Sequence, residues 1–146
     1  MTSTPLRRVV TGLDADGKSC ILIDGPADQV IWATAETPVD NSGTADQGGS
    51  FSFAFPRGGS KFVMLEMPPG DGLFGPGMHA TDTIDYIAVL KGEVVLVTET
   101  EEVRCGPGDM IVDRGVMHGW RNHGPDTVFM AIAMIDAAPV GAGATI

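Results

Sequence analysis

The feature that most constrains the fold of this chain is a succession of short, strand-like runs separated by turn signals. The runs are rich in Val, Ile, Thr and other apolar residues, and Gly, Pro, Asn or Asp residues lie between them. No long segment combines the helical apolar period with good helix caps. The chain holds 20 Gly and 10 Pro residues, which is the supply of turn residues that many short strands require. This pattern predicts an all-β sandwich or barrel.

About ten runs are expected to form strands: Leu6–Thr11, Ser19–Asp24, Val30–Thr34, Lys61–Met67, Thr83–Leu90, Val94–Thr98, Glu101–Arg104, Met110–Asp113, Met117–Arg121 and Thr127–Ile135. The first two flank the turn 14–17 and are predicted to pair as a hairpin. The turn at Gly92 is expected to fold Val94–Thr98 back onto Thr83–Leu90 as a second antiparallel hairpin. The polar stretch Pro38–Ser50 is expected to be a mobile loop, and the small-residue tail 137–146 a frayed, flexible end.

Length and charge bound the function. A chain of 146 residues is one ordinary domain, so we expect a single domain over 1–146. The formal net charge of −10 opposes a nucleic-acid backbone or an anionic membrane surface, so neither is an expected partner.

No apolar run reaches the length of a membrane span. The start 1–5 is polar and no signal-peptide core follows Arg7 and Arg8, which predicts a cytoplasmic protein. The isolated Cys20 and Cys105 are expected to be buried as small hydrophobic side chains, without a disulfide or a catalytic role.

The chain has three histidines, and their positions suggest one site. On a strand, alternate residues share a face, so His79 is expected to share a face with Thr81, Thr83 and Asp85. In the later segment, His118 shares a face with Trp120 and Asn122. His123 has the opposite parity and is expected outside the site.

If both faces turn toward one interior, two imidazoles and one carboxylate converge. Two His and one carboxylate with open positions is a ligand set that suits non-haem Fe²⁺. We therefore predict a divalent metal on His79, Asp85 and His118, with Fe²⁺ favoured and Zn²⁺, Mn²⁺, Ni²⁺ or Co²⁺ also compatible. Thr81 is a weak ligand and leaves room for water, dioxygen or substrate.

Two segments resemble the two motifs of the cupin superfamily. Residues 77–93, with Met-His-x-Thr-Asp-Thr-x-Asp-Tyr, resemble the first motif, and residues 108–122 resemble the second. The spacing of Asp85 from Gly92, and of His118 from Gly115 and Asn122, matches the family pattern. The resemblance implies a jelly-roll β-barrel and is nearest to small single-domain cupins, some of which are tailoring enzymes of aromatic or polyketide metabolism.

The sequence departs from the family pattern at two ligand positions and in the second motif. The family has His-x-His followed by Glu, whereas here Thr81 replaces the second His and Asp85 stands at the Glu position. The Pro of the second motif falls on Asp113, and the stretch before it is one residue short. Family members that lack ligands can be metal-free binding or structural domains.

These observations leave three functions open. The first is a metal-dependent enzyme acting on a small organic acid, ketone or aromatic molecule, by oxidoreductase, dioxygenase, lyase or decarboxylase chemistry. The second is a non-catalytic small-molecule-binding module, and the third is a metal-independent isomerase or epimerase with a His base. Trp120, on the face of His118, is a candidate catalytic residue, and Glu66 is a candidate general base if it points inward. Cupins commonly form dimers, and the N-terminal hairpin is expected to leave a barrel edge that a second copy would cover, so a homodimer is expected.

Overall fold

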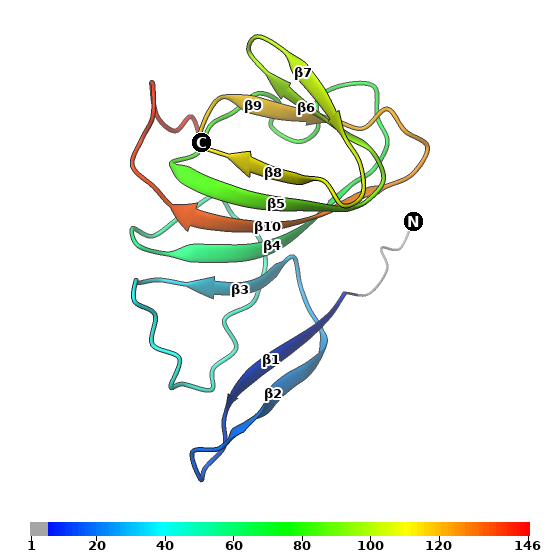
Figure 1. The fold of residues 1–146 in the computed structure, drawn as a ribbon. Helices are drawn as coiled ribbons and strands as arrows, with labels where there is room; N and C mark the ends of the chain where they lie inside the picture. The colour runs from blue at the N-terminus through cyan, green and yellow to red at the C-terminus, as the bar shows by residue number, and fades with distance from the viewer. Residues whose placement is uncertain (1–5) are drawn as a thin grey trace.

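The computed structural model describes residues 6–146, and the polar start 1–5 lies outside the described residues. The described chain is built of strands joined by turns and loops, without a helix (Figure 1). The strands are β1 Arg7–Leu13, β2 Ser19–Pro26, β3 Val30–Thr34, β4 Ser60–Met67, β5 Thr83–Lys91, β6 Val94–Thr98, β7 Glu102–Cys105, β8 Met110–Asp113, β9 His118–Arg121 and β10 Val128–Asp136. All the expected strands are present, with ends that differ by a few residues at most.

Two antiparallel sheets form the jelly-roll barrel. The larger has the order β3-β4-β10-β5-β8, and the smaller has the order β7-β6-β9. Residues along β5 and β10 alternate between buried and more exposed positions, as expected of strands with one face toward a core. The predicted all-β, jelly-roll fold is therefore confirmed.

The prediction that β5 and β6 pair as a hairpin is wrong. β5 pairs with β10 and β8 in the large sheet, whereas β6 pairs with β7 and β9 in the small one. Gly92 does form a turn, with a φ of 77°, and a Cβ there would lie 3.0 Å from a side-chain carbon of Val128. This glycine therefore turns the chain from one sheet to the other, because a turn residue determines a local bend and not which strand the returning segment pairs with.

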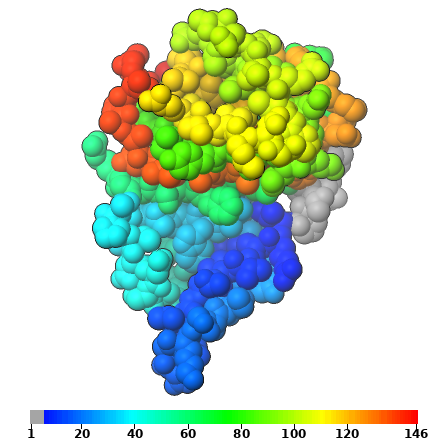
Figure 2. Space-filling view, in the orientation of Figure 1, coloured from blue at the N-terminus to red at the C-terminus, as the bar shows by residue number. Residues whose placement is uncertain are grey.

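The N-terminal hairpin is confirmed, but it is not the edge of the barrel. β1 and β2 pair antiparallel as a sheet of their own. Figures 1 and 2 show this hairpin, in dark blue, projecting away from the two barrel sheets. The edge strands of the large sheet are β3 and β8.

The two segments expected to lack regular structure differ from each other. Residues 38–48 carry no regular element, as predicted, and only an isolated bridge joins Gly49 to Val30. The tail, in contrast, returns to the barrel. Thr145 donates its backbone N–H to the carbonyl of Ala80 at 2.8 Å, and Ala144 donates to the Asp82 carboxylate at 2.9 Å. These bonds hold the tail beside the segment that carries His79.

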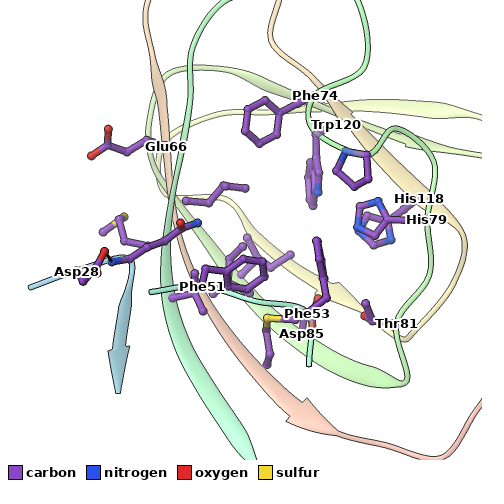
Figure 3. Close-up of a pocket in the computed structure, with 18 of the residues that line it drawn as sticks. Asp28, Phe51, Phe53, Glu66, Phe74, His79, Thr81, Asp85, His118 and Trp120 are labelled. Carbon is purple, nitrogen blue, oxygen red and sulfur yellow. Dashed lines mark hydrogen bonds between the residues drawn. The ribbon is translucent and has the colours of Figure 1, made fainter. Parts of the chain in front are cut away.

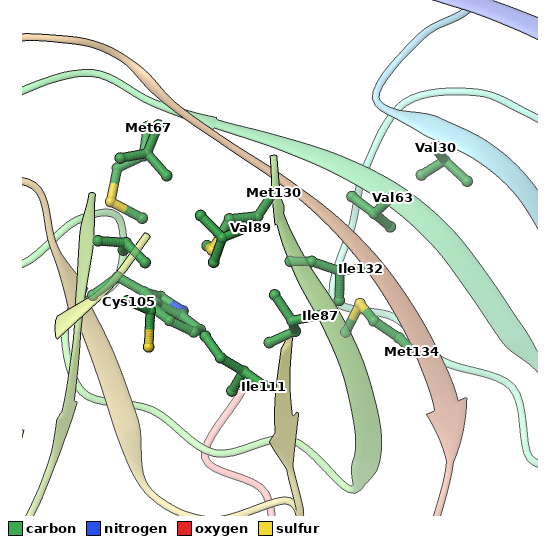
Figure 4. Close-up of a cluster of buried hydrophobic side chains, with 13 residues drawn as sticks. Val30, Val63, Met67, Ile87, Val89, Cys105, Ile111, Met130, Ile132 and Met134 are labelled. Atoms are coloured by element: carbon green, nitrogen blue, oxygen red, sulfur yellow. The ribbon is translucent and has the colours of Figure 1, made fainter. Parts of the chain in front are cut away.

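The core lies between the two sheets (Figure 4). Its most buried side chains come from both sheets: Met67, Val89, Val94, Val128 and Met130. Burying one such side chain contributes about 1.5–3 kcal/mol. Cys105 lies at the edge of this cluster as a free thiol, and burial raises the pKa of that thiol. Among residues 6–146 there is no helix that could cross a membrane.

Candidate functional site

A cavity of about 550 Å³ opens between the sheets and contains most of the predicted site residues (Figure 3). Its walls are apolar and aromatic, and a polar group lies at one end. The polar group consists of His79, Thr81, Asp85 and His118. The volume lies in the range typical of small-molecule pockets.

His118 opens β9, His79 lies in the segment before β5, and the two histidines are joined through their backbones. His79 donates its backbone N–H to the carbonyl of His118 and accepts from the N–H of His118, both at 2.9 Å. The ring centroids of the two imidazoles are 4.6 Å apart. The predicted convergence of His79 and His118 is therefore present, although His79 lies in an isolated bridge before β5 and not in a regular strand.

Backbone carbonyls select the same tautomer in both rings. The Nδ1 atom of His79 lies 2.8 Å from the carbonyl oxygen of Gly77, and Nδ1 of His118 lies 2.9 Å from that of Val116. A carbonyl oxygen only accepts hydrogen bonds, so each Nδ1 carries the proton. Each Nε2 is then left with a lone pair for a bound molecule. Burial, the largest cause, lowers the pKa of His79, which keeps that ring neutral near pH 7.

Asp85 is the third polar group, and two hydroxyls accompany it on the same face. Thr83 donates to Oδ1 of Asp85 at 2.8 Å, and the hydroxyls of Thr81 and Thr83 are 2.8 Å apart. Burial raises the pKa of Asp85 to about 6, the hydrogen bond from Thr83 lowers it, and the neighbouring charge of Asp113 raises it further. All four predicted residues, His79, Thr81, Thr83 and Asp85, are buried, as the alternation predicted.

The predicted three-ligand metal site is not assembled. Among residues 6–146, no three His, Cys, Asp or Glu side chains lie together in a way that could hold a metal ion. The alternation of a strand decides which face a side chain takes, but not its distance from another side chain on that face. Asp85 is also shorter than the Glu of the family pattern and already accepts a hydrogen bond from Thr83. Of the three residues predicted as ligands, the structure brings His79 and His118 together.

A residue that sequence reasoning did not propose lies behind the site. Asp113, on β8, is buried, and its Oδ2 lies 3.0 Å from Nδ1 of His118. The Nδ1 proton of His118 points to the Val116 carbonyl, so this oxygen has no hydrogen-bond partner within the described chain. The available signal was the replacement of the family's Pro by a carboxylate at position 113.

The remaining predicted residues fall in three places. Trp120 lines the pocket beside His118, with ring centroids 5.7 Å apart. Glu66 also borders the pocket, but Figure 3 shows its carboxylate on the side away from the histidines. The structure thus does not bring Glu66 to the imidazole pair. His123 is exposed and outside the pocket, as predicted.

An aromatic segment covers the histidine end. Phe53 packs edge-on against His79 with ring centroids 5.8 Å apart, and Phe51 packs against Phe53. Lys61 holds this segment, because its ammonium donates to the carbonyls of Ser52 and Ala54. The same ammonium lies 5.7 Å from the ring centroid of Phe51.

Comparisons with known proteins agree with this architecture. The Cupin domain family, Cupin_2, matches residues 63–135, from β4 to β10. The chain is 35% identical over 134 residues to phomopsin biosynthesis cluster protein D of Diaporthe leptostromiformis, with 79% of this chain and 69% of that protein covered. It is 28% identical over 155 residues to the cupin-domain-containing oxidoreductase srdB of Neurospora crassa, with 91% and 74% covered. It is 29% identical over 131 residues to the cupin-domain-containing oxidoreductase virC of Hypocrea virens, with 79% and 66% covered.

A similar solved structure is an RmlC-like cupin family protein with a double-stranded β-helix fold from Methanocaldococcus jannaschii. It has a TM-score of 0.47 and 15% identity, and the match covers 53% of this chain and 70% of that one. The family match spans half of the chain, and the phomopsin cluster protein supplies a relative at 35% identity. By the match to the family model, the chain belongs to the Cupin domain family.

Proposed function

We propose that this protein is an enzyme that removes a proton from a small organic molecule, with His79 and His118 in contact with the reacting atoms. One observation carries the proposal. Two imidazoles, each with its proton on Nδ1, lie together at the end of one apolar pocket. A neutral imidazole with a free Nε2 lone pair is the form of histidine that acts as a general base.

The polar group offers a route for the proton as well as a base. The His79 ring is neutral near pH 7 because burial lowers its pKa, so it can accept a proton from a bound molecule. Asp85, with a pKa raised to about 6, holds its proton at a higher pH than an ordinary carboxyl and can return it. Such a pair suits enolisation, isomerisation or a lyase reaction, in which a proton leaves one atom and is delivered to another.

The relatives support a role in small-molecule metabolism. Their names place one in phomopsin biosynthesis and call two others oxidoreductases. Oxidation of an enol or a phenol removes a proton together with electrons, so the same pair of bases could serve an oxidoreductase whose electrons pass to a separate acceptor such as dioxygen.

A metal-dependent oxidoreductase or lyase is the second candidate, favoured by the Nδ1 hydrogen bonds. Metal-binding histidines almost always donate their other ring N–H to a carbonyl or carboxylate, as both rings do here. His79 and His118 would supply two ligands, and water or substrate the others. A divalent ion held there, Fe²⁺ or one of the other first-row ions, would polarise a substrate oxygen.

The test is hydrogen exchange in heavy water. Chelator-treated protein is incubated with a panel of ring ketones and phenols, and deuterium incorporation at carbon is followed by NMR, without and with each added metal, because O–H protons exchange without a catalyst. The proposal expects exchange without metal, which His79→Ala and His118→Ala each abolish and His123→Ala retains. Exchange only with added metal, together with metal content that depends on both histidines, would establish the second candidate instead. Binding without any exchange would identify a non-catalytic binding module.

A further inference from the structure

The charges that line the pocket are of one sign. Three lining residues are carboxylic acids: Asp28, Glu66 and Asp85. Apart from the two histidines, no lining residue among positions 6–146 is basic. A bound phosphate or carboxylate would therefore find no arginine or lysine partner among the described residues of the lining.

Two cations of the surrounding segments, Lys61 and Arg8, are already engaged with other groups. The Lys61 ammonium donates to two backbone carbonyls of the segment 51–55 and lies over the rings of Phe51 and Phe55. Arg8 forms an ion pair with Asp46 and also donates to the carbonyl of Ile31. Neither side chain belongs to the pocket lining.

The walls favour a flat ring. Four aromatic side chains, Phe51, Phe53, Phe74 and Trp120, line the cavity, and Figure 3 shows Phe53 and Trp120 close to the histidine pair. Aromatic side chains pack edge-on or offset against another ring. With a cavity of about 550 Å³, the space suits a fused or substituted ring system rather than a short-chain acid.

A ligand at the histidine end of the pocket needs a group that donates a hydrogen bond. With both Nδ1 protons given to backbone carbonyls, Nε2 is the ring nitrogen left for a ligand, and in a neutral imidazole it is an acceptor. A ketone oxygen cannot bond to a lone pair, whereas the O–H of a phenol or enol can.

From these three observations we infer that the pocket selects an uncharged, hydroxyl-bearing ring compound, a phenol or an enol, and rejects carboxylates and phosphates. This inference rests on the proposed function, because it names the group from which the histidines remove a proton. The O–H lies against Nε2, the ring lies between the aromatic walls, and the described lining offers an anion no arginine or lysine partner.

The test uses three probes with the same ring system: naphthol, methoxynaphthalene and naphthoate, substituted at the same ring position. Binding to the full chain is measured by isothermal titration calorimetry at a pH where naphthol is neutral. We expect naphthol to bind at least about tenfold more tightly than its methyl ether, because the ether cannot donate to Nε2. Naphthoate is expected to bind at least about tenfold more weakly than naphthol. Equal or tighter binding of naphthoate, or equal binding of the ether, would overturn the inference.

Variants connect the selectivity to the named atoms. His118→Gln keeps a polar side chain and should reduce the preference for naphthol over the ether, while His123→Gln, at an exposed position, should leave it unchanged. If His118→Gln does not fold, the comparison of the three probes on the unmodified protein still decides the inference. Because binding needs no turnover, selective naphthol binding without hydrogen exchange would retain the inference and reject the enzymatic proposal. Exchange on ketones or carboxylates with no preference for naphthol would retain the enzymatic proposal and reject the inference.

Discussion

Oδ2 of Asp113 lies 3.0 Å from Nδ1 of His118, and both side chains are buried. The Nδ1 proton of His118 is directed to the Val116 carbonyl. Oδ2 of Asp113 therefore lies beside the imidazole but accepts no hydrogen bond within the described chain. A buried charge of this kind costs stability, and it is retained where it acts on a neighbour. Asp113 can stabilise the positive charge that His118 gains when Nε2 takes a proton.

Replacing this carboxylate should therefore separate stability from activity. Asp113→Asn removes the charge at nearly constant volume, so we expect the free energy of unfolding to rise by about 1 kcal/mol, measured by urea denaturation. Hydrogen exchange on an accepted substrate should fall at least about tenfold, with a larger effect on kcat than on KM. Asp126→Asn, at an exposed aspartate, is the control and should change neither quantity. A loss of stability together with full activity would show that Asp113 is only a structural residue.

The raised pKa of Asp85 predicts how stability depends on pH. The folded protein holds this proton up to a pH of about 6, whereas an unfolded aspartate loses it near 3.8. Between these values the native state binds more protons than the unfolded state, so the stability falls as pH rises from about 4 to about 6 and then stays level. At about 1.4 kcal/mol for each pKa unit, ionised Asp85 costs roughly 3 kcal/mol.

Asp85→Asn should remove this pH dependence. Urea denaturation across the same pH range is expected to give a flatter stability curve than that of the unmodified chain, with the variant more stable near pH 7. Asp82 directly precedes β5, but Asp82→Asn is less suitable as a control because the Asp82 carboxylate accepts a hydrogen bond from the tail. The exposed Asp16 is better, and Asp16→Asn should leave the slope unchanged. An equal slope in the Asp85→Asn protein would contradict the assignment.

Turn residues and β-rich runs predicted the positions of the strands well, but they led to one wrong strand pairing, that of β5 with β6. Turn residues and β-rich runs located β3 and β8 to the residue, because both properties depend on neighbours in the chain. The pairing of β6 with β9 depends on contacts between distant segments, and a glycine at position 92 is equally compatible with a hairpin and with a turn between sheets. Only the closure of the whole barrel decides between them.

Alternation likewise predicted the members of the site but not all their contacts. It placed His79 and Asp85 on one buried face and His123 outside, and the structure agrees. Alternation carries no information on distance. It therefore did not show that Asp85 would accept a hydrogen bond from Thr83, or that the described residues would hold no cluster of three His, Cys, Asp or Glu ligands. Asp113 was missed because its role comes from the position of His118 on another strand, and a sequence pattern does not contain that position.

The bonds of Lys61 predict how the pocket is covered. Its ammonium holds the segment 51–55 through two carbonyls, and this segment places Phe53 against His79 and Phe51 against Phe53. Lys61→Met keeps most of the apolar stem but removes both bonds, and hydrogen bonds from a charged donor are each worth about 1.5–3 kcal/mol. We expect faster proteolysis within 51–55 and naphthol binding weakened at least about fivefold. Lys18→Met, in an exposed turn, is the control, and equal proteolysis of both variants would contradict this role of Lys61.

The projecting N-terminal hairpin predicts the oligomeric state. Within the described chain, β1 and β2 pair only with each other, so each has an unpaired edge. Val9, Leu13 and Ile21 lie on one face of this hairpin with about half of each side chain exposed. We expect a homodimer in which a second copy covers this hairpin, because an exposed apolar face beside open strand edges favours association.

Sedimentation equilibrium with two matched variants tests this expectation. Ile21→Lys places a charge on the hairpin face, and Met110→Lys places the same charge on β8, where the side chain is 74% exposed. The unmodified chain and Met110→Lys are expected to sediment as dimers, and Ile21→Lys as a monomer with an unchanged circular dichroism spectrum. A monomeric unmodified chain would contradict the dimer. A dimer that Met110→Lys disrupts and Ile21→Lys leaves intact would instead place the interface on the large sheet, where the side chains of Tyr86 and Val112 are also exposed.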